Sequence, residues 1–157
     1  AGARNIVGTD LSPYRRNLAM KMGATLVLDP TRENLREKMT NLHMVGGFDV
    51  GLECSGSPVA FNDMVNNMYN GGKISLLGLL PSSTQINWSK VIFKGLTLKG
   101  IYGREMYETW YQMEMMLLTG LDISEVITHR FPAERFQEAF DIMESGNSGK
   151  IILDWNE

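Results

Sequence analysis

The stretch Asn5–Arg16, with the sequence NIVGTDLSPYRR, constrains the fold of this chain more than any other segment. The β-branched pair Ile6–Val7 suits a buried strand, and the run ends at a lone acid, Asp10. Ser12 can cap a helix with its hydroxyl, and Pro13 suits the first helical position because proline has no N–H to leave unpaired. A strand that ends in a carboxylate and turns into a helix is typical of doubly wound domains that bind the ribose of an adenosine. The same pattern also fits a surface acid at a strand end.

Strand-like and helix-like segments alternate along the chain. The expected strands are the run up to Asp10, Thr25–Asp29, Phe48–Ser55, Lys73–Leu80 after the Gly71–Gly72 break, Leu96–Gly103, Val126–Phe131 and Ile151–Trp155. The expected helices run from Pro13 to about Gly23, from Thr31 as cap to about Leu42, and over Val59–Met68, Met106–Leu118 and Ala133–Ser145, the last with Phe136, Ala139, Phe140 and Met143 inward. Strands separated by helices in this way predict an α/β fold with a doubly wound parallel sheet.

Composition excludes several classes of protein. The chain of 157 residues has a net charge of −3 and no basic run, which argues against a nucleic-acid surface. It has no apolar run of the roughly 20 residues that a membrane span needs, and its first residues do not resemble a signal peptide. A single cysteine, Cys54, rules out an internal disulfide and favours a reducing compartment, so we expect a cytoplasmic protein.

The usual beginning of a dinucleotide-binding domain is not found in this sequence. Such a domain starts with a strand, a G-x-G-x-x-G turn and a helix that receives the pyrophosphate. This chain opens on AGAR, which is typical of the end of that helix, and none of its glycines forms the G-x-G-x-x-G pattern. We therefore interpret the chain as part of a longer protein, with a sheet that lacks its first strand and glycine-rich turn.

Several segments resemble the zinc-dependent L-threonine 3-dehydrogenases of the medium-chain dehydrogenase/reductase superfamily. The matching segments are GARNIVGTDLSPYR, GGFDVGLECSGSP, GGKISLLGLLPS, NWSKVIFKGLTLKGIYGREMYETWY and ITHRFPAERFQEAFDIMESGNSGKIIL. They cover nearly the whole chain, and VIFKGLTLKGIYGREMYETWY is the most specific of them. The family oxidises L-threonine to 2-amino-3-oxobutanoate, with NAD accepting the hydride and zinc polarising the substrate hydroxyl.

The resemblance also implies roles for particular residues. Asp10 would bind the adenosine ribose of NAD, with Arg15 beside it, while two further strand ends would pass under the nicotinamide half. The residues at those ends are Leu77, Gly78, Leu79, Ile101 and Tyr102. Carboxyl ends of parallel strands are where ligands bind in open α/β sheets, and Gly78 has no Cβ to keep a ring away.

The family's zinc ligands and its catalytic histidine and glutamate correspond to positions upstream of this chain. We therefore expect no metal site and no catalytic residue here, and no dehydrogenase activity from this chain alone. Cys54 matches none of the zinc ligands and is expected to be a buried thiol, as free cysteines usually are. His43 and His129 are expected to be structural or surface residues, and Glu53 to be a local hydrogen-bonding group.

The resemblance suggests a division of the chain and a subunit contact. Residues 1–121 would form part of the NAD-binding domain, and residues 122–157 would pack toward a catalytic domain. The family is a tetramer, and Asn87–Gly95 carries the apolar side chains of Trp88, Val91, Ile92 and Phe93 on a connecting segment, so we expect it to be a subunit contact.

Two alternatives remain open. A related polyol or alcohol dehydrogenase would share Asp10 and the strand ends, although the segment after Gly100 favours the threonine type. A non-catalytic nucleotide-binding or assembly module would also hold an adenosine. A G-x-G-x-x-G turn and zinc-ligand cysteines in the upstream reading frame would favour the enzyme, whereas a start codon just before Ala1 would favour the module.

Overall fold

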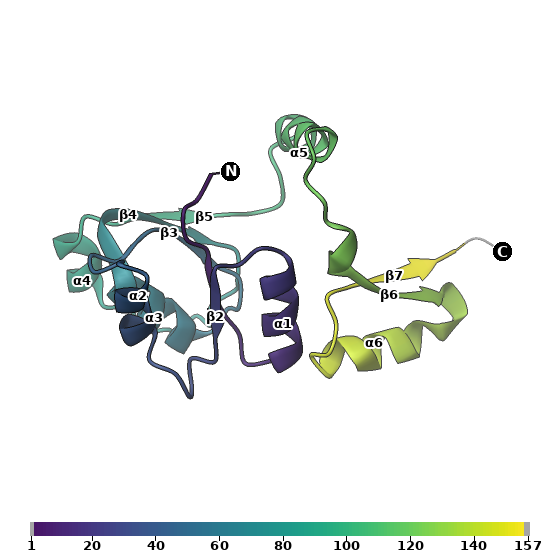
Figure 1. Ribbon diagram of the computed structural model, residues 1–157, viewed down its shortest axis with the longest axis horizontal. Coiled ribbons are helices and arrows are strands. Elements are labelled where there is room, and N and C mark those ends of the chain that lie inside the picture. Colours follow the sequence, from purple (N-terminus) through teal and green to yellow (C-terminus); the bar gives the residue numbers. More distant parts are fainter. Residues whose placement is uncertain (1, 156–157) are drawn as a thin grey trace. The chain divides into compact units, whose positions relative to one another are not determined.

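The computed structural model describes residues 2–155, and Figure 1 labels its helices and strands. These elements divide between two compact units. One unit joins the residues up to 35 with those from 112 onward, and the other comprises Arg36–Tyr111. Each strand pair in the described chain is parallel, and helical segments connect the paired strands. The α/β class with parallel strands is therefore confirmed.

The unit Arg36–Tyr111 is built on a three-stranded sheet. Its order is β3–β4–β5, with β3 at Phe48–Glu53, β4 at Met68–Leu76 and β5 at Thr97–Gly100. Helix α2 (Leu35–Asn41) leads into β3. Helices α3 (Pro58–Asn67) and α4 (Trp88–Phe93) precede β4 and β5 and cover one face of the sheet (Figure 1).

The core of this unit lies between that sheet face and its two covering helices. Its buried residues are Phe61, Val65, Met68, Ile74 and Val91. Full burial of one such side chain contributes about 1.5–3 kcal/mol to folding, so this cluster is the main apolar support of the sheet. The opposite face leaves Val50 and Leu52 of β3 exposed.

The other unit contains two parallel strand pairs, each with a helix between its strands. Strand β1 (Val7–Thr9) pairs with β2 (Leu26–Leu28) across helix α1 (Pro13–Lys21). Strand β6 (Ile127–Pro132) pairs with β7 (Lys150–Asp154), with the short helix η2 (Ala133–Arg135) and helix α6 (Phe136–Glu144) between them. Helix α5 (Glu108–Leu118) crosses the boundary between the units, and the turn η1 (Ser124–Val126) precedes β6.

The two strand pairs of this unit are joined by a side-chain hydrogen bond. The hydroxyl of Ser12, at the start of α1, donates to the carbonyl oxygen of Gly146 at 2.8 Å. The same Ser12 Oγ accepts from the Arg15 N–H at 3.3 Å, and Pro13 occupies the first turn of α1. The predicted helix start at Ser12 and Pro13 is therefore confirmed.

Two predicted element starts are wrong. Helix α2 begins at Leu35 instead of following a Thr31 cap, because the Thr31 hydroxyl donates to Asp29 Oδ1 at 2.6 Å and holds a turn there. Strand β4 begins at Met68 and contains Gly71–Gly72, which was expected to open the strand. An irregularity in the β3–β4 register accommodates these glycines, since Phe48 pairs with Met68 and Val50 pairs with Lys73.

The predicted inward face of α6 is only partly correct. Ala139 is buried, but Phe136, Phe140 and Met143 are exposed. Helix α6 packs against β6 and β7, and this two-stranded sheet is too narrow to cover a full apolar helix face. Phe136 and Phe140 instead contact each other edge to face, with ring centroids 6.5 Å apart.

Within residues 2–155, no helix has both the length and the apolar character required to cross a membrane.

Candidate cofactor site

Asp10 follows β1 directly and closes the turn into α1. Its backbone N–H donates to the Leu28 carbonyl at 3.3 Å, which extends the β1–β2 pairing by one bond. The Ser12 N–H donates to Asp10 Oδ1 at 2.8 Å. The carboxylate is thus half-buried and oriented by the turn at the N-terminal end of a helix, where the helix dipole favours negative charge.

The two arginines that follow Asp10 differ in their surroundings. Arg15 is exposed and shares the Asp10 turn through its N–H bond to Ser12. Arg16 is held, because its Nη1 donates to the Asp10 carbonyl at 2.6 Å and lies 3.5 Å from Asp29 Oδ2. Only 17% of the Arg16 side chain is exposed.

Asp29 stands at the end of β2 as Asp10 stands at the end of β1. Its Oδ1 accepts from the Thr31 hydroxyl at 2.6 Å and from the Thr31 N–H at 3.0 Å. These hydrogen bonds, with the positive charges of Arg16 and Arg32, hold the pKa of Asp29 below its usual value. The sequence analysis did not pair Arg16 with Asp29. A signal for this contact was present in the sequence, because an acid follows each of the two strands. Neighbouring parallel strands end at the same edge of a sheet, so the two acids and the helix between them lie close together.

The second group of predicted residues follows β4. The N–H groups of Leu77 and Gly78 donate to the Glu53 carbonyl at 2.8 and 3.0 Å, so the ends of β3 and β4 meet. A Cβ on Gly78 would lie 2.2 Å from the Gly56 nitrogen and 2.3 Å from Glu53 Oε2. Glycine is therefore required at position 78 by the chain's own packing. Leu77 and Leu79 are exposed on either side of it.

Ile101 and Tyr102 follow β5 at the same edge. The Ile101 N–H donates to the Leu76 carbonyl at 2.9 Å, which ties the end of β5 to the end of β4. Ile101 is half-buried, whereas the Tyr102 side chain is fully exposed. The structure thus brings the residues after β4 and β5 together in one unit, and it brings Asp10 and Arg15 together in the other.

Glu53 is a local hydrogen-bonding group, as predicted. It is 2% exposed, and its Oε1 accepts from the Ser55 N–H at 2.9 Å, from the Ser55 hydroxyl and from the Gly56 N–H. The prediction of a buried Cys54 thiol is wrong, because Cys54 is exposed. Side chains alternate along a strand, and burial of Glu53 directs its neighbour Cys54 toward the open side with Val50 and Leu52.

The described residues do not supply a zinc site. Among residues 2–155, no three His, Cys, Asp or Glu side chains come together as a metal-binding group. His43 is exposed at a turn with a positive φ of 57°, and the His129 Nδ1 lies 2.9 Å from the Thr128 hydroxyl. Both histidines therefore have structural or surface positions.

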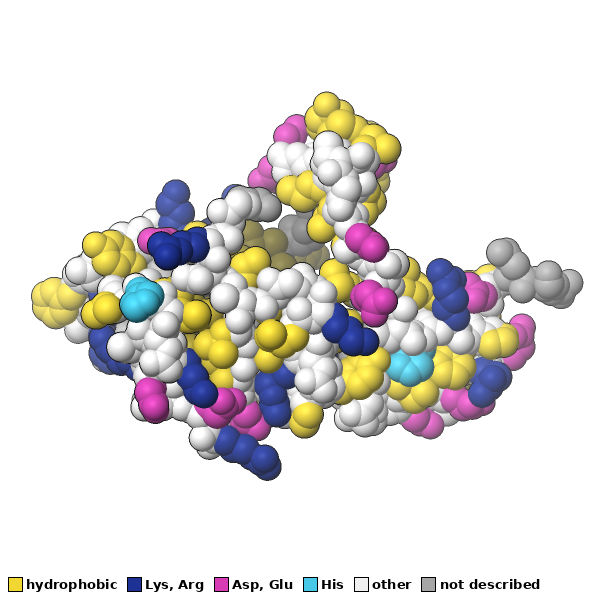
Figure 2. All heavy atoms as spheres, viewed as in Figure 1, with side chains coloured by type: hydrophobic (Ala, Val, Ile, Leu, Met, Phe, Trp, Pro, Cys, Tyr) yellow, Lys and Arg dark blue, Asp and Glu magenta, His cyan; other side chains and the backbone are white. Residues whose placement is uncertain are grey.

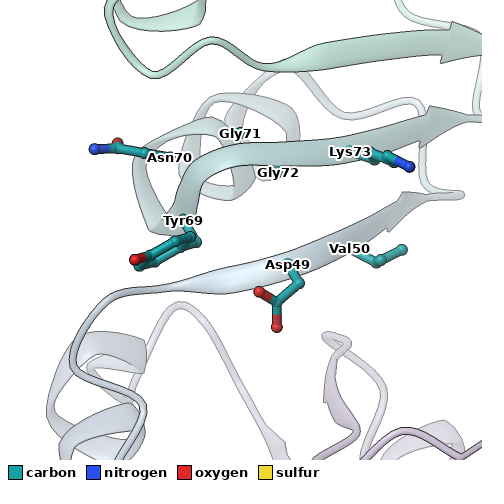
Figure 3. A pocket seen from close by; sticks show the side chains of 7 residues that line it. All are labelled: Asp49, Val50, Tyr69, Asn70, Gly71, Gly72 and Lys73. Carbon is teal, nitrogen blue, oxygen red and sulfur yellow. The ribbon is translucent and has the colours of Figure 1, made fainter.

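A shallow hollow of about 260 Å³ lies at the opposite, amino-terminal end of β3 and β4 (Figure 3). Its lining residues are Asp49, Val50, Tyr69, Asn70, Gly71, Gly72 and Lys73. The side chains of Asn70 and Lys73 point away from each other (Figure 3), so the polar groups do not converge on one point. Ligands of parallel sheets bind at the carboxyl ends, so this hollow is a weaker candidate than the Asp10 turn of one unit or the β4 and β5 ends of the other.

Hydrophobic side chains are exposed over α4 and α5 (Figure 2). On α4 they are Trp88, Ile92 and Phe93, while Val91 turns inward to the core. Exposed apolar side chains that gather on one element are typical of an interaction surface.

The chain belongs to the zinc-binding dehydrogenase family. The family model described as "Zinc-binding dehydrogenase" matches residues 1–144. Among its relatives, proteins named L-threonine 3-dehydrogenase from Alteromonas mediterranea and Burkholderia ambifaria are 58% and 59% identical over 98% of this chain. The chain spans 45% of the length of each.

Solved structures show the same fold at lower identity. An alcohol dehydrogenase zinc-binding domain protein from Burkholderia ambifaria superposes with a TM-score of 0.86 at 24% identity, over 100% of this chain and 43% of that one. A short chain alcohol dehydrogenase from Escherichia coli CFT073, complexed with cofactor NADH, superposes with a TM-score of 0.83 at 17% identity. That match covers 98% of this chain and 45% of the other.

Proposed function

We propose that this chain is the NAD-binding part of an L-threonine 3-dehydrogenase, which oxidises L-threonine to 2-amino-3-oxobutanoate. The observation that carries the proposal is the Asp10 turn, where a strand-end carboxylate is oriented by the Ser12 N–H beside a helix N-terminus. The proteins of 58–59% identity that are named for this activity support the choice of substrate. The chain spans 45% of their length, which agrees with its being one part of such an enzyme.

In this proposal the chain binds and orients the cofactor. Asp10 accepts hydrogen bonds from the ribose hydroxyls, and exposed Arg15 lies beside the adenosine. Leu77–Leu79 and Ile101–Tyr102 support the nicotinamide half at the ends of β4 and β5. When bound, NAD supplies the hydride acceptor. Residues 1–121 belong to the coenzyme domain and residues 122–157 pack toward the catalytic domain, which carries the zinc ligands.

The segment Asn87–Gly95 is the proposed contact between subunits of a homo-oligomer. Trp88, Ile92 and Phe93 are 57%, 72% and 87% exposed, although they are among the largest apolar side chains of the unit. Helix α4 leads into β5, which stands at the end of the β3–β4–β5 order. The exposed face and the strand that follows it could thus be covered by a second copy of the chain.

The substrate assignment is tested with the full-length protein that carries this chain. With zinc and NAD present, L-threonine should give NADH with a kcat/KM at least tenfold above those for 2,3-butanediol and sorbitol. A higher value for either diol or polyol would favour the alternative dehydrogenase, and no turnover of any substrate would favour the binding module. The isolated chain should produce no NADH above background, because the family's catalytic residues lie upstream.

A further inference from the structure

Arg16 is a cation beside the residue that is proposed to hold the ribose. Cations at this place accommodate the 2′-phosphate in proteins that bind NADP. The Arg16 guanidinium is nevertheless turned toward the protein, because Nη1 donates to the Asp10 carbonyl at 2.6 Å and 17% of its side chain is exposed.

Besides the Asp10 carbonyl, Arg16 contacts the carboxylate of Asp29, which supplies the opposite charge. Its Oδ2 lies 3.5 Å from Arg16 Nη1, and its side chain is 11% exposed. Its Oδ1 is fixed by the Thr31 hydroxyl and N–H, and its own N–H donates to Glu33 Oε2 at 3.0 Å. Both oxygens of the Asp29 carboxylate therefore have partners that fix their positions. Its lowered pKa keeps it ionised near neutral pH.

We propose that Asp29 is a positioning residue that determines cofactor specificity by holding and neutralising Arg16, so that Arg16 is withheld from the 2′-phosphate of NADP. This proposal rests on the proposed function. It adds a second acid, at the end of β2, to the discrimination made by Asp10 at the end of β1. Asp10 repels the phosphate directly, whereas Asp29 acts through Arg16.

The charges of the pair explain the expected effect. An ion pair this poorly exposed is screened by water and salt less than a surface pair. Without the Asp29 carboxylate, the guanidinium would keep its hydrogen bond to the Asp10 carbonyl but lose the charge that offsets it. An uncompensated cation next to the ribose site then favours the cofactor that carries the extra phosphate. Arg32, the other cation near Asp29, has an 82% exposed side chain and should contribute little.

The test is calorimetric titration of the full-length protein with NAD and with NADP. Asp29→Asn should raise the ratio of NADP to NAD affinity by about fivefold. In the Arg16→Met background, Asp29→Asn should leave the ratio within about twofold of the value for Arg16→Met alone, because the cation that Asp29→Asn would release is then absent. Arg32→Met is the matched control, since it removes the exposed cation from the same carboxylate and should not move the ratio.

An unchanged ratio in Asp29→Asn would overturn the proposal, and so would an equal loss of affinity for both cofactors. A rise that persists in the Arg16→Met background would also overturn it, because the effect would then not pass through Arg16. If Asp29→Asn does not fold, Thr31→Val loosens Oδ1 and should raise the ratio by about twofold, and no rise there would count against the proposal. Failure of the unaltered protein to bind NAD would instead reject the proposed function.

Discussion

At the scale of single residues, the two acids that follow β1 and β2 make different contacts. The Asp10 carboxylate is half-buried and oriented by one N–H bond, whereas Asp29 accepts two bonds from Thr31 and faces Arg16. Sequence analysis predicted the position of Asp10, because a strand end followed by a helix cap is a local pattern. It did not predict the use of Asp29, because the Arg16 contact depends on the pairing of two strands that are separated by a helix.

Asp29 should make the stability of the protein depend on pH in the acid range. The Thr31 bonds, then the charges of Arg16 and Arg32, lower its pKa in the folded state. A carboxyl whose folded pKa is lowered adds stability above its unfolded pKa of about 3.9 and loses it as the pH falls through the folded value. The thermal midpoint of Asp29→Asn should therefore lie below that of the unaltered protein at pH 7, and the gap should close as the pH falls below about 4.

Asp49→Asn removes one negative charge from an exposed position and controls for net charge in this comparison. A gap for Asp29→Asn that is constant from pH 7 to pH 3 would show that Asp29 acts by packing rather than by its charge.

At the scale of elements, local signals predicted some helix starts and missed others. The predicted start at Ser12–Pro13 is present, with the Ser12 hydroxyl accepting an N–H bond from the first turn. The helix expected over Val59–Met68 begins one residue earlier, at Pro58, where the Ser57 hydroxyl supplies a cap of the same kind. Thr31 has the same capping chemistry, but Asp29 captures its hydroxyl and α2 starts later. The α6 face was misassigned because a helical stripe indicates which residues share a side but not whether a surface covers them.

Lys94 directly follows α4, and its side chain caps the C-terminal end of α3. Its Nζ donates to the carbonyl oxygens of Val65, Asn66 and Met68 at 3.1, 2.7 and 2.8 Å. The last carbonyls of a helix have no partner within the helix, so Lys94→Met should lower the free energy of unfolding by about 1–3 kcal/mol. Lys90→Met removes an exposed lysine that reaches Asn66 and should cost less than about 1 kcal/mol. Equal losses for the two variants in urea titrations would contradict this role for Lys94.

The exposed face of α4 predicts an effect on assembly. Ile92→Lys places a charge on the apolar surface formed by Trp88, Ile92 and Phe93, and should lower the oligomeric state in light scattering because burying that charge is costly. Val45→Lys introduces the same charge at an exposed residue of a loop and should leave assembly unchanged. A folded Ile92→Lys protein with the original mass would reject this surface as the contact.

At the scale of the whole molecule, sequence analysis predicted the class of fold, which is confirmed, and the strand ends that it assigned to the cofactor stay a prediction. Alternating strands and helices determine that class, and the carboxyl ends of the strands follow from it. For Gly78, sequence analysis predicted that the missing Cβ lets a cofactor ring come close to the backbone. The structure shows instead that a Cβ at this position would clash with Glu53 and Gly56. Contacts of this kind join separate strands, so a linear pattern does not reveal them.

The central claim is that Asp10 holds the adenosine ribose of NAD. The measurement that tests it most directly is kcat/KM of the full-length protein for NAD and for NADP, before and after Asp10→Ser. The unaltered protein should favour NAD by at least about tenfold, since Asp10 accepts the ribose hydroxyls and repels a 2′-phosphate. Asp10→Ser should shift the ratio toward NADP, with exposed Arg15 as the nearby cation while Arg16 stays bound to Asp29. A ratio that does not move would contradict the claim that this strand end binds the cofactor.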